Sequence, residues 1–287
     1  MAQRLRLEDV SYSYPLPGRE DAPALQGASL SVEPGEVFCI AGANGSGKST
    51  LAQVCAGLLA PTSGSVLYGE EAVFGRGALR GFRRRVGLLF QSPEDQLFAD
   101  TVAKDIAFGP RNHGLKGEEL KAAVARSAGL VGLSLDELGA RSPFSLSEGE
   151  KRRAALAGVL ALDPEVLVLD EPFIGLDFDG RERLKSALMR YGEERGASII
   201  VVTHELSDVW PLANRFAMLS EGRLLGVEDK SDLVSGDTDL AALGMKMPQW
   251  GELARELLRL GIPVAGHSDP LAIARALASH REATGDR

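Results

Sequence analysis

The strongest chemical signal in the sequence is a glycine-rich segment near its beginning. Residues 42–49 read Gly-Ala-Asn-Gly-Ser-Gly-Lys-Ser and fit the pattern G-x-x-x-x-G-K-[ST], whose backbone N–H groups form a nest for phosphates. Glycine has no Cβ, so the backbone can turn tightly and approach a phosphate closely. Lys48 would place a positive charge at the β- and γ-phosphates, and the Ser49 hydroxyl could bind Mg²⁺. We therefore predict that a nucleoside triphosphate is bound by Gly42, Asn44, Gly45, Ser46, Gly47, Lys48, Ser49 and Thr50.

The elements on either side of this loop are the ones that such a site needs. Residues 36–41 form an apolar run typical of a buried strand, and residues 49–59 are predicted to form a helix. The phosphates would then lie at a helix N-terminus, where the helix dipole favours negative charge. The alternative is a glycine-rich turn that only joins a strand to a helix, but the full pattern in this order favours nucleotide binding.

A second apolar strand ends in two carboxylates. Residues 166–169 are Val-Leu-Val-Leu, and Asp170 and Glu171 follow directly. The last residues of such a strand reach the crevice at its carboxyl end, where ligands bind in open α/β sheets. Asp170 could hold Mg²⁺ or its water, and Glu171 could orient or deprotonate an attacking water. A solvated acidic loop is the alternative; it is disfavoured because a phosphate loop needs a metal-binding acid on a neighbouring strand.

The composition limits the remaining possibilities. The chain has 287 residues, 44% of them hydrophobic, and a net charge of −8, which argues against nucleic acid as the main partner. Cys39 and Cys55 are expected in the core, and no Cys/His spacing suggests zinc. No signal-peptide core begins the chain, and no stretch approaches the roughly 18 apolar residues of a membrane span. We therefore expect a cytoplasmic chain whose role at a membrane would come through a partner.

The wider pattern predicts an α/β fold with a helical insertion. Continuous β-rich runs such as residues 198–202 suit a parallel sheet covered on both faces. Further strands are expected at 4–14, 25–32, 66–68 and 86–90, with a terminal hairpin of 216–220 and 223–227. Helical spacing dominates from about residue 93 to residue 162, with breaks predicted at Gly109-Pro110, Gly114 and Ser142-Pro143.

The end of the chain differs from the rest because no strand is expected after about Gly236. Helical spacing there relates Trp250, Leu253, Leu257 and Leu260. We therefore predict a nucleotide-binding domain of residues 1–235, containing a helical subdomain at about 92–163, and a helical extension of residues 236–287.

A third motif opens a helix predicted to run to Leu162. Ser147 and Glu150 have the spacing of a capping box. Leu146-Ser147-Glu148-Gly149-Glu150, which lies shortly before the Asp170-Glu171 strand, also resembles the LSGGQ signature of ATP-binding cassette (ABC) ATPases. In that family the N–H donors of this helix start grip the γ-phosphate bound by the opposing subunit. The resemblance thus implies that Ser147 and Gly149 contact ATP held by a second ABC ATPase subunit.

The resemblance extends over most of the chain and implies further roles. Gln91 is similar to the family's Q-loop glutamine, which contacts Mg²⁺, and Asp177 in Gly175-Leu176-Asp177 is similar to its D-loop. His204 ends a strand as the family's switch histidine does, and with Glu171 it would act in catalysis. Tyr14 resembles the aromatic that stacks on adenine, although Tyr12 shares its strand face. The implied fold is that of an ABC-type P-loop NTPase, with a mixed, mostly parallel sheet, an antiparallel β subdomain and a helical subdomain.

A narrower likeness involves residues 90–98, Thr101-Val102 and Phe108–Pro110, which resemble the ATPase subunits of energy-coupling factor (ECF) transporters. It implies ATP and Mg²⁺ as cofactors, a homodimer or heterodimer of ATPase subunits, a transmembrane scaffold (T component) and a substrate-binding membrane S component. The chain would lie at the cytoplasmic face of the membrane and power the import of vitamins or transition-metal ions. An ATPase for a conventional ABC transporter, a soluble ABC ATPase without a transport role and a regulatory nucleotide-binding module remain alternatives.

The sequence departs from the family pattern at several positions. Glu148 and Glu150 replace the signature's first glycine and its glutamine, and two carboxylates near a triphosphate should repel it if they point inward. Phe173-Ile174 and Phe178 depart from the Thr-Ala and Pro of the wider family. We expect these changes to affect the rate of hydrolysis or the symmetry of the dimer rather than nucleotide binding.

Overall fold

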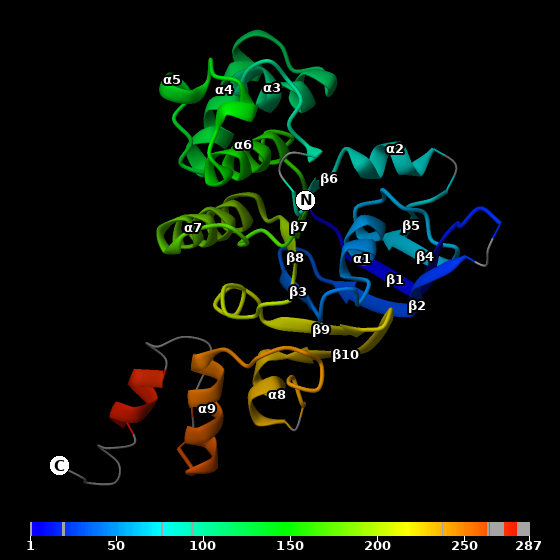
Figure 1. Cartoon of the computed structure of the whole chain (residues 1–287), viewed down its shortest axis with the longest axis vertical. Coiled ribbons are helices and arrows are strands. Elements are labelled where there is room, and N and C mark those ends of the chain that lie inside the picture. Colours follow the sequence, from blue (N-terminus) through cyan, green and yellow to red (C-terminus); the bar gives the residue numbers. More distant parts are fainter. Residues whose placement is uncertain are drawn as a thin grey trace.

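The computed structural model describes residues 2–18, 21–75, 77–92, 95–236, 238–262, 264 and 273–279. Two sheets occupy the middle of the molecule (Figure 1). A group of helices, α3 to α6, lies at one end, and the C-terminal helices lie at the other.

The larger sheet has six strands in the order β10-β9-β3-β8-β7-β6. Neighbouring strands from β6 to β9 are parallel, and β10 pairs with β9 antiparallel. Every residue of β7 and β8 is buried. This agrees with the prediction, made from their apolar sequences, that these strands are covered on both faces. The strands are β3 (Val37–Ala41), β6 (Val86–Leu89), β7 (Val166–Asp170), β8 (Ser198–Thr203), β9 (Arg215–Ser220) and β10 (Arg223–Asp229).

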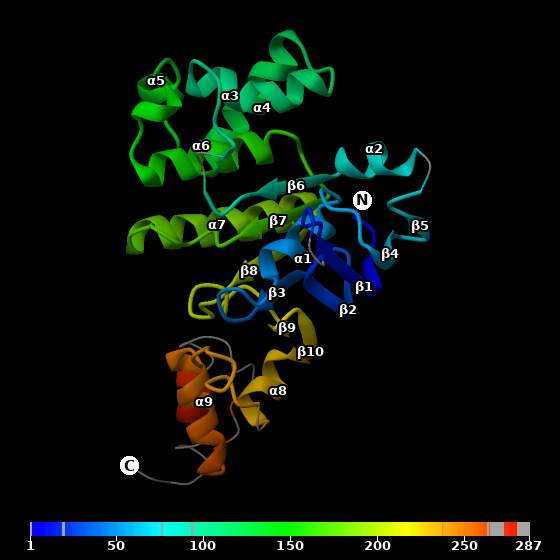
Figure 2. The ribbon, with the colours of Figure 1, turned by 45° about the vertical axis from the view of Figure 1, so that its right-hand side comes forward.

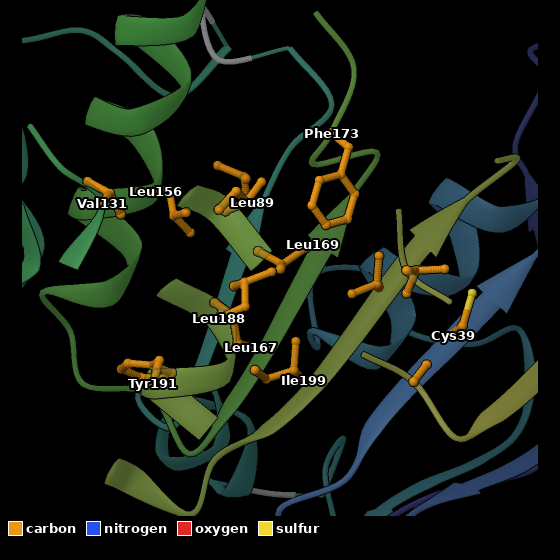
Figure 3. Close-up of a cluster of buried hydrophobic side chains, with 14 of the residues drawn as sticks. Cys39, Leu89, Val131, Leu156, Leu167, Leu169, Phe173, Leu188, Tyr191 and Ile199 are labelled. Atoms are coloured by element: carbon orange, nitrogen blue, oxygen red, sulfur yellow. The ribbon is translucent and has the colours of Figure 1, made fainter. Parts of the chain in front are cut away.

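Alternation along β7 divides the core in two. Leu167 and Leu169 belong to the cluster that packs against α6 (Glu148–Leu160) and α7 (Phe178–Arg195), where Figure 3 shows them beside Leu156 and Leu188. Val166 and Val168 point to the opposite face and belong to a second cluster. Each fully buried leucine stabilises the fold by roughly 1.5–3 kcal/mol relative to an exposed one, so both faces of β7 are fixed strongly.

The second cluster lies under an antiparallel sheet of order β2-β1-β4-β5. Helix α1 (Lys48–Cys55) packs between the two sheets and contacts β7 and β8 on one side and β1 and β2 on the other (Figure 2). The strands are β1 (Leu5–Tyr14), β2 (Ala22–Val32), β4 (Ser63–Tyr68) and β5 (Glu71–Ala72), and the short helix α2 (Ala78–Arg83) follows them.

The helical region contains α3 (Val102–Asn112), α4 (Gly117–Leu130) and α5 (Leu135–Leu138), then a 3₁₀ turn (Pro143–Ser145) and α6. The predicted breaks at Gly114 and at Ser142-Pro143 are confirmed, but the break at Gly109-Pro110 is wrong. Pro110 lies inside α3, two residues before its end. The missing proline N–H therefore removes only one hydrogen bond near the terminus, and the helix continues for one half-turn.

A glutamine side chain closes the outer edge of the main sheet. Gln96 accepts a hydrogen bond from the Phe90 N–H at 2.9 Å and donates one to the Leu88 carbonyl at 2.8 Å. The neighbouring Leu97 is buried, whereas Phe98 is 58% exposed. The segment after β6 is thus fixed to the sheet while it presents an aromatic ring to solvent.

The C-terminal part contains α8 (Lys230–Ser235), α9 (Gln249–Arg259) and a helix at 273–279, and no strand follows β10 in the described residues. The helix predicted from the spacing of Trp250, Leu253, Leu257 and Leu260 is confirmed as α9, with Leu260 directly after its end. Of these four residues, Leu257 is buried, but Trp250, Leu253 and Leu260 are at least 39% exposed. The buried face is instead formed by Gly251, Ala254 and Leu257, because α9 packs on Trp210 and Met247 through the small side of its surface. None of the described helices has the length and apolarity needed to cross a membrane.

Candidate functional site

A cavity of about 680 Å³ lies at the carboxyl end of β3 and the N-terminus of α1. The parallel strands explain its position, because they deliver the residues after β3 and β7 to the same edge of the sheet. It is lined by Tyr14, Pro23, Ala24, Asn44, Gly45, Gly47, Lys48, Ser49, Thr50, Gln91, Glu171, Glu221 and Gly222.

Two glycines of the loop are required by close packing. A Cβ on Gly42 would lie 2.2 Å from the Leu219 carbonyl oxygen. Gly47 has φ +101°, and a Cβ there would lie 2.5 Å from the Ala24 carbonyl oxygen. No L side chain fits such approaches to backbone, so the loop can rest on β9 and β2 only with glycine at these positions.

The side chain of Lys48 folds back onto the glycine-rich loop. Its side chain is buried and donates a hydrogen bond from Nζ to the Ala43 carbonyl oxygen at 2.9 Å. Burial lowers the pKa of Lys48, while the charges of Glu171 and Asp170 oppose that shift. The nearby Ser46 hydroxyl is buried and has no hydrogen-bond partner among the described residues. The loop therefore holds a partly desolvated cation and an unused donor, a combination suited to phosphate oxygens.

Asp170 ends β7 beside this loop. It is 5% exposed, and its Oδ1 has no hydrogen-bond partner among the described residues. Burial raises the pKa of Asp170, against the hydrogen bond from Ser49 and the charge of Lys48. A buried carboxylate oxygen next to a serine hydroxyl is the kind of donor set that Mg²⁺ prefers, so these residues fit that ion.

The carboxylate of Glu171 is bound by residues at the end of the neighbouring strand β8. Its carboxylate accepts hydrogen bonds from the Thr203 hydroxyl at 2.9 Å and the His204 N–H at 3.0 Å, and it lies 2.6 Å from His204 Nδ1. The backbone of Glu171 is left-handed, with φ +48°, which turns its carboxylate toward β8. The structure thus joins the two residues predicted to act in catalysis, which are 33 positions apart in the sequence.

Ser147, Gly149 and Asp177 lie elsewhere. They line a different pocket of about 360 Å³, which shares no lining residue with the first. Asp177 caps α7 by accepting a hydrogen bond from the Gly180 N–H at 2.8 Å. The residues predicted to act on one triphosphate are therefore divided between two surfaces of the chain.

The predicted capping box at the start of α6 is confirmed. Glu150 accepts hydrogen bonds from both the N–H and the hydroxyl of Ser147, each at 2.8 Å. These two bonds lower the pKa of Glu150. Glu148 instead forms an ion pair with Lys151 at 2.9 Å. One of the two unusual carboxylates is therefore bound to the signature serine itself.

The side of the cavity near Tyr14 includes both predicted and unpredicted residues. Tyr14 lines it, and the Tyr14 hydroxyl lies 3.1 Å from that of Thr50. Tyr12 contacts the Tyr14 ring edge-on and packs on the core instead. The cavity also contains four residues that were not predicted to line it, namely Pro23, Ala24, Glu221 and Gly222; Glu221-Gly222 was predicted only as a hairpin turn. Their place in the cavity depends on strand pairing that local pattern does not reveal.

Known proteins resemble this chain in sequence and in structure. Residues 25–174 match the family described as ABC transporter. The energy-coupling factor transporter ATP-binding protein EcfA2 of Clostridium acetobutylicum is 38% identical over 263 residues, covering 91% of this chain and 92% of that protein.

Solved structures agree with the sequence relatives. The structure of cbiO1 from Clostridium perfringens, part of the ABC transporter complex cbiONQ, has a TM-score of 0.72 and 31% identity, covering 88% of this chain and 99% of its own. The ATP-binding cassette MJ0796, a dimer bound to ADP and Pi, has a TM-score of 0.72 and 27% identity, covering 78% of this chain and 98% of its own. The chain therefore belongs to the ABC transporter family, as an ATP-binding and ATP-hydrolysing subunit of the energy-coupling factor type.

Proposed function

We propose that this chain works in a dimer of ATPase subunits, in which two ATP molecules are bound head to tail between the subunits. The observation that carries the proposal is the division of the site, since the loop cavity and the Ser147–Gly149 pocket share no residue. Each reaction centre would combine the cavity of one subunit with Ser147, Gly149 and Asp177 of the other. The MJ0796 cassette, whose structures are dimeric, supports the same arrangement.

Binding in the cavity would use the residues already arranged for it. Lys48 and the N–H groups of the loop would hold the β- and γ-phosphates, and Tyr14 would stack on adenine. Mg²⁺ would be held by Ser49, Asp170 and Gln91, and when bound it neutralises charge on the phosphate oxygens. The unpartnered Oδ1 of Asp170 supports this assignment.

Hydrolysis would be an in-line attack by water on the γ-phosphorus, which breaks its bond to the bridging oxygen and releases ADP, while Glu171 positions the water and accepts its proton. His204 Nδ1 lies against Glu171, so Nε2 is the ring nitrogen left to contact the γ-phosphate. Positioning and electrostatic stabilisation by fixed groups would thus supply the acceleration.

The work of the dimer would be delivered to membrane partners. Phe98 and Phe108 are exposed and stack edge-on with centroids 4.7 Å apart, next to the segment that Gln96 fixes to β6. We infer that this surface receives helices of a transmembrane T component, with a membrane S component binding the vitamin or metal ion. The relatives' names, which assign them to ECF transporters and to the cbiONQ complex, support an association with membrane components. The chain would then lie at the cytoplasmic face of the membrane.

The decisive experiment replaces Glu171 by Gln in the complex purified through a tag on this chain. We expect ATP hydrolysis to fall by about 100-fold or more, because the water loses its base, while ATP now stabilises the dimer. Dimerisation is measured by light scattering with and without ATP, and the co-purified subunits are identified by mass spectrometry. Turnover at the wild-type rate would disprove the role of Glu171. Co-purification of ribosomes or DNA instead of membrane proteins would favour a soluble ATPase.

A further inference from the structure

A single buried arginine joins the helix that begins at Ser147 to both sides of the reaction centre. Arg152 lies in the second turn of α6 and is 8% exposed. It donates one hydrogen bond from Nη1 to the carbonyl oxygen of Glu171 at 2.6 Å and another from Nη2 to the carbonyl oxygen of Gln91 at 2.9 Å. The two acceptors lie on different loops, after β7 and after β6.

The geometry suits arginine in particular. A guanidinium has donors in a rigid planar fork and keeps its charge when buried, so it can hold two acceptors at a fixed angle. Burial lowers the pKa of Arg152, and the charges of Glu148 and Glu171 oppose that shift. Hydrogen bonds from a charged donor in a buried position are stronger than neutral ones, which makes this contact costly to break.

At Glu171 the arginine fixes the one backbone group that β8 leaves unused. The Glu171 N–H donates to the Val202 carbonyl at 2.8 Å, and its carboxylate is held by Thr203 and His204. Arg152 makes the shorter of two hydrogen bonds to the remaining carbonyl, at 2.6 Å, and the Ile174 N–H makes the other at 3.4 Å. Because the backbone here has φ +48°, a rotation of this peptide would redirect the carboxylate. The orientation of the residue that would position water therefore depends on α6.

At Gln91 the arginine holds only the backbone. The Gln91 side chain lines the loop cavity and is exposed, whereas its carbonyl oxygen is bound to Arg152. A movement of α6 would thus be transmitted to Gln91 and to Glu171 by the same side chain.

We propose that Arg152 is a positioning residue, which aligns Glu171 and Gln91 together when the Ser147 end of α6 contacts nucleotide in the partner subunit. This inference rests on the proposed function, because it assumes that the Ser147 end of α6 contacts that nucleotide. In this view Arg152 contacts neither nucleotide nor the attacking water. It links the nucleotide in the partner's site, through Ser147 and α6, to Glu171 and Gln91 in the chain's own site, which it prepares for hydrolysis.

The test compares Arg152→Met, Arg152→Lys and the control Arg126→Met, an equal change at an exposed position on α4. ATP affinity is measured with a fluorescent ATP analogue, and kcat, KM and melting temperature are measured on the purified complex. For Arg152→Met we expect kcat to fall by about 10- to 100-fold with ATP affinity changed by less than about threefold, since misplacement of a reacting group has effects of this size.

Arg152→Lys should recover only part of kcat, because one ammonium cannot bind both carbonyls in the same geometry. It also keeps the charge, so it remains informative if Arg152→Met does not fold. The proposal is overturned if Arg152→Met turns over ATP like wild type, or if kcat, ATP affinity and melting temperature fall together, which would make Arg152 merely structural. An inactive wild-type complex would instead disprove the proposed function.

Discussion

The loop cavity of one subunit and the Ser147 end of α6 in its partner would contact the same triphosphate, yet these two regions of the chain are built differently. The loop site contains buried polar groups: Lys48, which lines the cavity, and Asp170, which ends β7 beside the loop, are at most 6% exposed, and oxygen atoms of Ser46 and Asp170 lack partners among the described residues. The Ser147 end is a surface feature whose donors are already bound to Glu150. The loop site is therefore organised in advance for a charged ligand, whereas Ser147 must give up its hydrogen bonds to Glu150 before it can bind a phosphate.

The largest effect that tests this contrast is expected from Lys48→Ala. Removing a charged donor from a buried site costs on the order of 1.5–3 kcal/mol, so nucleotide affinity should weaken by about 10- to 100-fold. A titration with a fluorescent ATP analogue measures this, with Lys104→Ala, an exposed ion-paired lysine, as control. Unchanged affinity in Lys48→Ala would contradict the view that the loop site is organised in advance for a charged ligand.

A second, intermediate effect concerns Asp170→Asn. The Mg²⁺ concentration that supports half-maximal ATP hydrolysis should rise by about tenfold or more, since a charged metal ligand is lost. Asp136→Asn, on the exposed side of α5, should leave it unchanged. An unaltered Mg²⁺ requirement would exclude Asp170 as a ligand.

We also expect the effect of Asp170→Asn on the melting temperature to depend on pH. Burial raises the pKa of Asp170 in the folded state above its unfolded value, so the ionised carboxylate destabilises the nucleotide-free fold. This penalty is absent below the unfolded pKa and grows as the pH rises through the folded pKa. Asp170→Asn should therefore raise the melting temperature at neutral pH, and the gain should vanish on acidification. A lower melting temperature at neutral pH would mean that the attraction to Lys48 outweighs desolvation.

The smallest effect is expected from Glu150→Gln. Glutamine can still accept the Ser147 N–H, but it carries no charge, so the Ser147 hydroxyl would bind a phosphate more readily. ATP-dependent dimerisation in the Glu171→Gln background should tighten by about two- to fivefold, because a net hydrogen bond contributes only about 1 kcal/mol. Glu148→Gln removes the same charge from a residue paired with Lys151 and should change less. Equal effects would indicate general charge repulsion at α6 rather than competition for Ser147.

Local sequence predicted the structure correctly where that structure depends on a single short segment. The loop at 42–49, the strand before Asp170 and the capping box at Ser147 depend on short-range geometry and were predicted. The break at Gly109-Pro110 was wrong because a proline near a helix end costs little. The spacing of Trp250, Leu253 and Leu257 predicted a helix but not which of its faces is buried, because α9 packs through its small residues.

The interior of the candidate site could not be predicted in the same way. The contact between Glu171 and His204 requires that β7 and β8 be neighbours, and local pattern does not fix strand order. The two hydrogen bonds of Arg152 also join segments 61 and 19 positions away. These residues are recognisable from sequence only through the family resemblance or, for Arg152, not at all.

The side chain of Gln96 also affects the exposed edge of the main sheet. Its amide copies a peptide group and satisfies the Phe90 N–H and the Leu88 carbonyl on the outermost strand. An uncovered strand edge is a template on which other chains can add and aggregate. Gln96 makes two of the hydrogen bonds that an added strand would make on the edge of β6, so we expect it to disfavour pairing of that edge with another chain.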